Sequence, residues 1–147
     1  MAKRRAGVSD PGPANLDEAR RLIALYVRDA DSAAATAEAM AQICSRIVAH
    51  FDPLIGARGA QALLVRAVYI SKPWSKALEA VPTAEADADV ARDLAVCLRS
   101  AEPKEALTAA IAVLGTFVWL LTRFIGEDLG LRLLHDAFPG GLDGESE

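Results

Sequence analysis

Two His–Asp pairs are the first residues in the chain whose chemistry suggests a reaction. His50 and Asp52 stand directly before a proline, and His135 and Asp136 lie near the end of the last apolar segment. Imidazole and carboxylate groups brought together from two helix ends would suit metal binding or acid–base catalysis. Neither pair has HExxH or ExxH spacing, and the helix dipole alone favours histidine near a helix C-terminus. We therefore interpret both pairs as ordinary helix-end residues.

A second cluster combines basic and aromatic side chains. Its members are Arg58, Arg66, Tyr69, Lys72 and Trp74. Cationic groups beside aromatic rings bind phosphates and carboxylates. The same side chains are also typical of a solvated helix face whose long stems cover a tryptophan. The cluster is the candidate site for a ligand or a nucleic acid, and a solvated helix face is the simpler alternative.

The rest of the sequence offers little catalytic chemistry. Walker, Rossmann, CxxC and GxSxG motifs are absent. The net charge of −4 and the pI of about 5.2 disfavour a nucleic-acid partner. Cys44 and Cys97 each lie in a helical apolar pattern, which favours two buried reduced thiols over a disulfide. We therefore predict no catalytic residue, no cofactor and no metal.

Composition predicts an all-α protein. Hydrophobic residues make up 52% of the chain, but 30 of its 147 residues are alanine, the strongest helix former. Apolar and polar residues never alternate with the period of a strand, and aromatic residues are only 5%. The length suits one domain. We expect a flexible arm over residues 1–14, a helical domain over 15–139 and a flexible acidic tail over 140–147.

Local signals divide the domain into about six helices. Asn15 is the predicted first cap, Asp31 or Ser32 the second and Thr83 a later one. Pro53 is expected to end a helix at Asp52, with a turn over residues 53–59. Further breaks are predicted at Pro73, Pro82 and Gly126.

Residues 103–125 are predicted to form the central helix of the bundle. Apolar residues recur there at 4-3-4-3-4 spacing, at Leu107, Ile111, Leu114, Val118, Leu121 and Ile125. The flanking positions are uncharged too, so the helix is apolar all round and should be buried on most sides. Residues 106–122 form an uncharged run of 17, near the lower limit for a membrane span, but threonines and alanines dilute it. We favour a buried helix, and expect no membrane contact.

The last helix carries two apolar stripes. Leu129 and Leu133 lie on one side, and Leu131, Leu134 and Phe138 lie nearly opposite. One stripe should meet the central helix, while the other needs a neighbouring helix or another molecule. We therefore predict that part of the second stripe is exposed in one chain and buried in a homodimer or partner complex.

These patterns favour a non-enzymatic interaction or regulatory module that acts through a protein partner or a homodimer. The alternative is a small-molecule sensor with an apolar pocket between helices, its mouth formed by Arg58, Arg66 and Trp74. An enzyme using His50 or His135 is the second alternative. The basic N-terminus runs into Ser9–Pro13 rather than into an apolar run, so we predict a cytoplasmic protein, and its arginine-rich composition is typical of a GC-rich bacterial genome.

Overall fold

The chain is all-α over the residues that the computed structural model describes, which are 13–27, 29, 31–83 and 89–138. The α-helices in that part are α1 (Pro13–Tyr26), α2 (Ala33–Ser71), α3 (Val90–Arg99), α4 (Pro103–Ile125) and α5 (Glu127–Ala137), with two 3₁₀ turns, η1 (Lys72–Trp74) and η2 (Lys76–Leu78). None of those residues forms a strand, so the predicted fold class is confirmed. The described residues form five α-helices where about six were expected for the domain, because residues 33–71 form one element.

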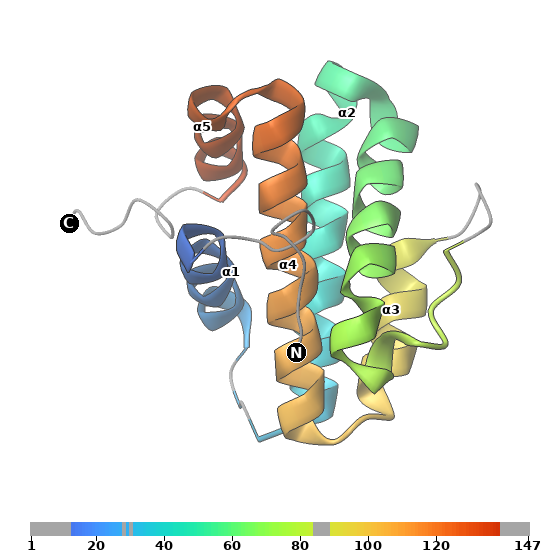
Figure 1. Ribbon diagram of the computed structural model, residues 1–147. Helices are drawn as coiled ribbons and strands as arrows, with labels where there is room; N and C mark the ends of the chain where they lie inside the picture. The colour runs from blue at the N-terminus through green and yellow to red at the C-terminus, as the bar shows by residue number, and fades with distance from the viewer. Residues whose placement is uncertain (1–12, 28, 30, 84–88, 139–147) are drawn as a thin grey trace.

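Two glycines make the sharp corners of the fold. Gly56 has φ 84° and ψ 150°, and there α2 folds back so that its two arms lie side by side (Figure 1). Gly126, with φ 95° and ψ 152°, joins α4 to α5 in the same backbone conformation. Residues with a Cβ rarely adopt this backbone conformation. The prediction that Pro53 ends the helix at Asp52 is wrong by about one turn, because the chain stays helical past Pro53 until Gly56 permits the corner.

Several other local signals act as expected. Ser32 caps α2, its Oγ accepting a hydrogen bond from the Ala35 amide at 3.1 Å, and α2 ends at Ser71, two residues before Pro73. Asp89 caps α3 through the Arg92 amide at 3.2 Å. The prediction that Thr83 caps the helix of Val90 and Leu94 is wrong, because that helix begins at Val90 and the extended residue before it, Asp89, is its cap. Residues 84–88 lie outside the described residues. So do residues 1–12 and 139–147, which hold most of the two predicted tails, while α1 begins at Pro13, ahead of the predicted Asn15.

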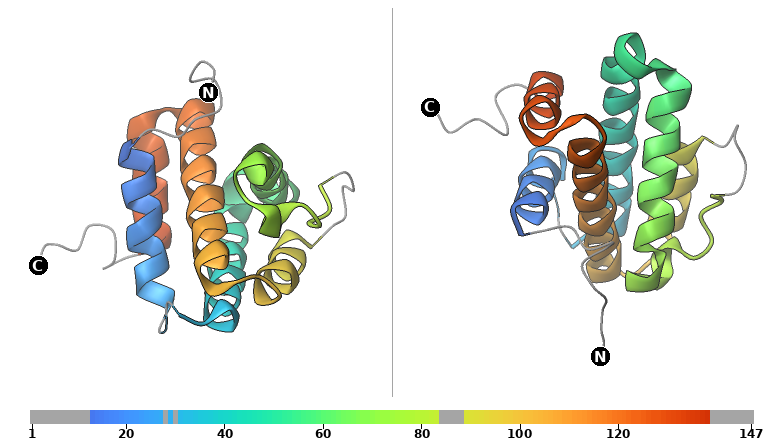
Figure 2. Two further views of the ribbon diagram at one scale, coloured as in Figure 1. Left: turned by 60° about the horizontal axis from the view of Figure 1, so that its bottom comes forward. Right: turned by 45° about the horizontal axis from the view of Figure 1, so that its top comes forward.

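In the bundle, α4 lies between the α1–α5 pair on one side and the two arms of α2 on the other, and α3 packs on the far side of α2 (Figures 1 and 2). The rings of Phe51 and Phe117 meet edge to face at 6.2 Å between the first arm of α2 and α4. At the end of the second arm, the hydroxyl oxygens of Ser71 and Thr116 are 3.2 Å apart in a buried hydrogen bond. Leu114 is fully buried, as the sequence predicted.

The outer face of α4 is less covered than its inner face. Trp119 and Leu120 are half-buried, and Phe124 is 63% exposed. Among the described residues, α4 is the one helix long and apolar enough to cross a membrane by length and composition, and half of its most apolar window is buried inside the fold. The outer face of α4 and the second arm of α2 together form the groove described next.

Candidate functional site

Two adjoining hollows form a groove between the second arm of α2 and the C-terminal half of α4. One stretch, of about 570 Å³, begins near the Gly56 corner and is lined by Ile55, Gly59, Ala62, Leu63 and Phe124. The next stretch, of about 750 Å³, is lined by Tyr69, Ile70, Lys72, Pro73, Glu79 and Trp119. Arg66, Leu120 and Arg123 line both stretches. We call this surface the α2–α4 groove.

The first stretch is apolar and has a low wall on its α2 side. Gly59 has no side chain and Ala62, about one turn away on α2, has only a methyl group, which leaves room for another backbone to approach. Phe124 forms the opposite wall and is 63% exposed. Leu54, beside the same corner, is 55% exposed. Exposed apolar side chains that gather beside a groove are typical of an interaction surface.

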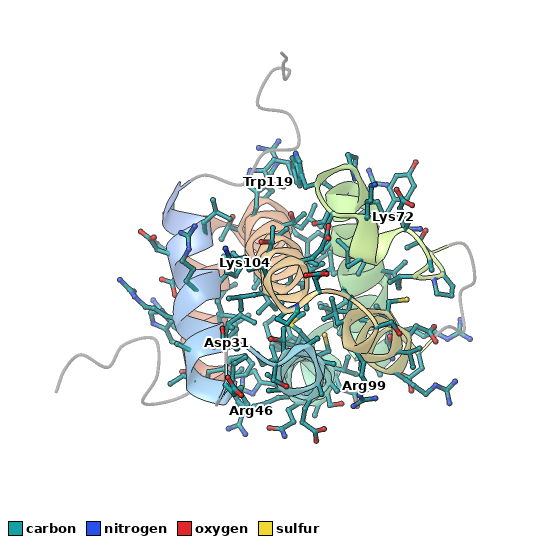
Figure 3. The ribbon with its side chains drawn as sticks, turned by 90° about the horizontal axis from the view of Figure 1, so that it is seen from below. Asp31, Arg46, Lys72, Arg99, Lys104 and Trp119 are labelled. Carbon is teal, nitrogen blue, oxygen red and sulfur yellow. The ribbon has the colours of Figure 1, made fainter. Side chains whose placement is uncertain are left out.

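The second stretch is cationic and aromatic. The Arg123 guanidinium lies over the Trp119 ring, 5.0 Å from its centroid. Tyr69 is 58% exposed on the facing helix. The Lys72 ammonium donates to the Glu79 carbonyl at 3.4 Å. Figure 3 places Trp119 and Lys72 on the same side of the molecule, opposite Arg46 and Arg99.

The groove contains part of the ligand site predicted from the sequence. Arg66, Tyr69 and Lys72 line it, whereas Arg58 and Trp74 are not among its lining residues. Trp74 is 44% exposed on η1. Ligand binding at these five residues remains a prediction.

Sequence reasoning missed the α4 side of the groove. Because residues 103–125 are apolar all round, the helix was expected to be buried on most sides, and Trp119, Arg123 and Phe124 were not considered as surface residues. One signal was present in the sequence. Trp119 and Arg123 are four residues apart, which stacks a cation on an aromatic ring along one helix face.

The second apolar stripe of α5 is mainly core. Leu134 is fully buried, Phe138 is 2% exposed and Leu131 is half-buried. Helices of the same chain cover Leu134 and Phe138, so Leu131 is the member of this stripe that keeps accessible surface, and an interface at the stripe stays a prediction. The Phe138 ring meets the Tyr26 ring edge to face at 6.1 Å. The exposed apolar residue of α5 is instead Leu129.

An arginine from α2 fixes the end of α5. The Arg46 Nε donates a hydrogen bond to the Ala137 carbonyl, and the Arg46 guanidinium lies 5.7 Å from the centroid of the Phe138 ring. A cation at a helix C-terminus meets carbonyls that have no partner inside the helix. This contact holds the predicted second stripe against the core.

The two predicted His–Asp pairs do not form one site. Across the described residues, three or more His, Cys, Asp or Glu side chains never gather in a way that would hold a metal ion. The His50 ring lies against Phe51, with the centroids 5.7 Å apart. His135 faces α1 instead, with its Nε2 3.8 Å from the Glu18 carboxylate. That pair joins α5 to α1.

Comparison with protein-family models, with curated proteins and with solved structures finds no match for this chain.

Proposed function

We propose that this chain is a non-enzymatic interaction module that binds a partner protein through the α2–α4 groove. The observation that carries the proposal is the groove itself, an apolar trough between two helices with exposed apolar residues beside it. A helix laid into such a trough buries its own apolar stripe against both helices, which is a common mode of protein recognition.

The shape of the groove favours a protein helix over a small molecule. The wall residue Phe124 and the facing Tyr69 are both more than half exposed. Sites for small ligands are usually concave enough to bury most of the ligand surface. A helix needs only one face covered, because its other face remains in water.

The second candidate is the small-molecule sensor. Its support is the cation-lined stretch, where Arg66, Arg123 and Lys72 would suit an anionic head group. A ligand of this kind should raise the melting temperature of the chain, since binding to the folded state alone stabilises it. An apolar pocket fully enclosed between helices is not required for this candidate.

We also propose that α4 is the central helix around which the bundle is organised, because it contacts all four other α-helices. A cytoplasmic location is likewise a proposal, supported by the free thiols of Cys44 and Cys97.

The test compares two variants in which an exposed alanine of α2 is replaced by glutamate. Ala62→Glu places a carboxylate on the low α2 wall of the groove, and Ala49→Glu makes the same change at an exposed site on the other arm of α2. Both should fold, because both positions are exposed. In pull-downs from native lysate, a stoichiometric partner should be retained by the parent and by Ala49→Glu but lost by Ala62→Glu. Equal retention by the two variants would place binding outside the groove.

A further inference from the structure

The charge of the α2–α4 groove is opposite to that of the whole chain. The chain has a net charge of −4. The groove is lined by three cations, Arg66, Lys72 and Arg123, and by the single carboxylate of Glu79. A local field that opposes the overall charge selects partners by electrostatic complementarity.

The cations are placed to meet a partner. Arg66 has no ion-pair partner among the described residues, and the Arg123 guanidinium is held over Trp119 rather than against a carboxylate. Both arginines lie where the apolar stretch joins the cationic stretch. An occupant that fills the apolar stretch would therefore bring its flanking polar groups next to them.

The dimensions suit an α-helix. The second arm of α2 spans residues 57–71, which at 1.5 Å per residue is about 22 Å. A partner helix of about 15 residues, or four turns, would match this length. The bare backbone at Gly59 and the methyl group of Ala62 allow such a helix to approach closely.

From the positive charge and the length of the groove, we propose that its occupant is an amphipathic helix of a partner protein. The carboxylates of that helix flank its apolar stripe and face Arg66 and Arg123. This proposal rests on the proposed function. A second copy of this chain fits less well. A symmetric dimer across the groove would bring the same cations of two copies together. An acyl chain also fits less well, because the exposed walls would leave much of it in water.

Trp119 provides a reporter inside the groove. The chain has two tryptophans, and Trp74→Phe leaves Trp119 as the only one. The probes are two synthetic peptides of about 15 residues with leucines spaced for one helix face. One peptide carries glutamates at the polar positions, and the other carries lysines there. Vesicles of phosphatidylcholine and phosphatidylglycerol are the third probe.

We expect the glutamate peptide to change Trp119 fluorescence in a saturable way, with an affinity that falls as sodium chloride rises. The lysine peptide should bind about tenfold more weakly. Arg66→Glu with Arg123→Glu should reverse this preference. The matched pair Arg92→Glu with Arg132→Glu, at exposed sites outside the groove, should leave it unchanged.

Equal affinity for the two peptides, preference for the lysine peptide, no binding of the glutamate peptide, or a response to vesicles alone would overturn the acidic-helix assignment. The proposed function fails separately. If Ala62→Glu still loses a lysate partner while the peptides show no charge preference, groove binding stands and the acidic chemistry falls. If Ala62→Glu affects neither the lysate partner nor the peptides, both proposals fall.

Discussion

At the scale of single residues, the two cysteines differ in how deeply their thiols are buried. Cys44 is fully buried, and this burial, together with the negative charge of Asp89, raises the pKa of its thiol to about 12. Cys97 is only partly buried. Partial burial and the charge of Asp93 raise the Cys97 pKa, while Lys72 acts in the opposite direction. Because the thiolate is the nucleophile, the two side chains should differ in reactivity.

Thiol labelling of the native chain at pH 8 should therefore modify Cys97 first and Cys44 only as the protein unfolds. Cys97→Ser should remove the fast phase. A raised pKa in the folded state also means that the stabilising contribution of neutral Cys44 is complete below pH 9, the ordinary pKa of the thiol, and is lost as pH rises towards 12. Rapid labelling of both thiols in the folded parent protein would contradict the buried position of Cys44.

The two glycine corners decide the path of the chain at the element scale. A Cβ placed on Gly56 or Gly126 would meet no atom within 4 Å, so space does not require glycine at either corner. The requirement comes from the backbone, since φ values of 84° and 95° are strained for any residue with a Cβ.

Gly56→Ala should lower the free energy of unfolding by about 1–3 kcal/mol. Gly59→Ala, one turn away, is the matched control. Gly59 lacks a positive φ, and an added Cβ would meet Ile55 at 3.4 Å, an ordinary contact. Gly59→Ala should leave the free energy of unfolding unchanged or raise it by up to about 1 kcal/mol, because alanine has the higher helix propensity. Chemical denaturation measures both variants, and an equal effect of the two would remove the argument for a strained corner.

Contacts of α4 extend through the whole molecule. It packs against α1, both arms of α2 and α5. Leu114, near its middle, is fully buried in the core. A carboxylate placed at this position would lose its hydration without gaining a partner. The cost should be shared by every element that rests on α4.

Leu114→Asp should therefore cost about 5 kcal/mol or more, comparable with the whole stability of a small domain. We expect loss of the cooperative thermal transition in circular dichroism. Leu129→Asp is the control, because Leu129 is 46% exposed on α5 and the same change there should have a small effect. A Leu114→Asp variant that melts like the parent would show that α4 does not organise the bundle.

The sequence by itself determined the helical class and several boundaries. The cap at Ser32, the end of α2 before Pro73 and the break at Gly126 depend on a few neighbouring residues. A missing amide hydrogen, a short polar side chain or an absent Cβ acts on the backbone within one turn. Such signals are therefore legible without knowledge of the fold, although the corner at Gly56 shows that a proline and a glycine close together compete for the boundary.

Only the tertiary structure decided which apolar faces are covered. Leu134 and Phe138 on α5 are buried, whereas on the outer face of α4 Leu120 is only half-buried and Phe124 is 63% exposed. Likewise, Arg66 and Arg123 are 57 positions apart in the chain and line the same groove only because α2 and α4 lie side by side. Apolar periodicity fixes which residues share a helix face, but burial depends on contacts between distant segments, and these contacts created the groove.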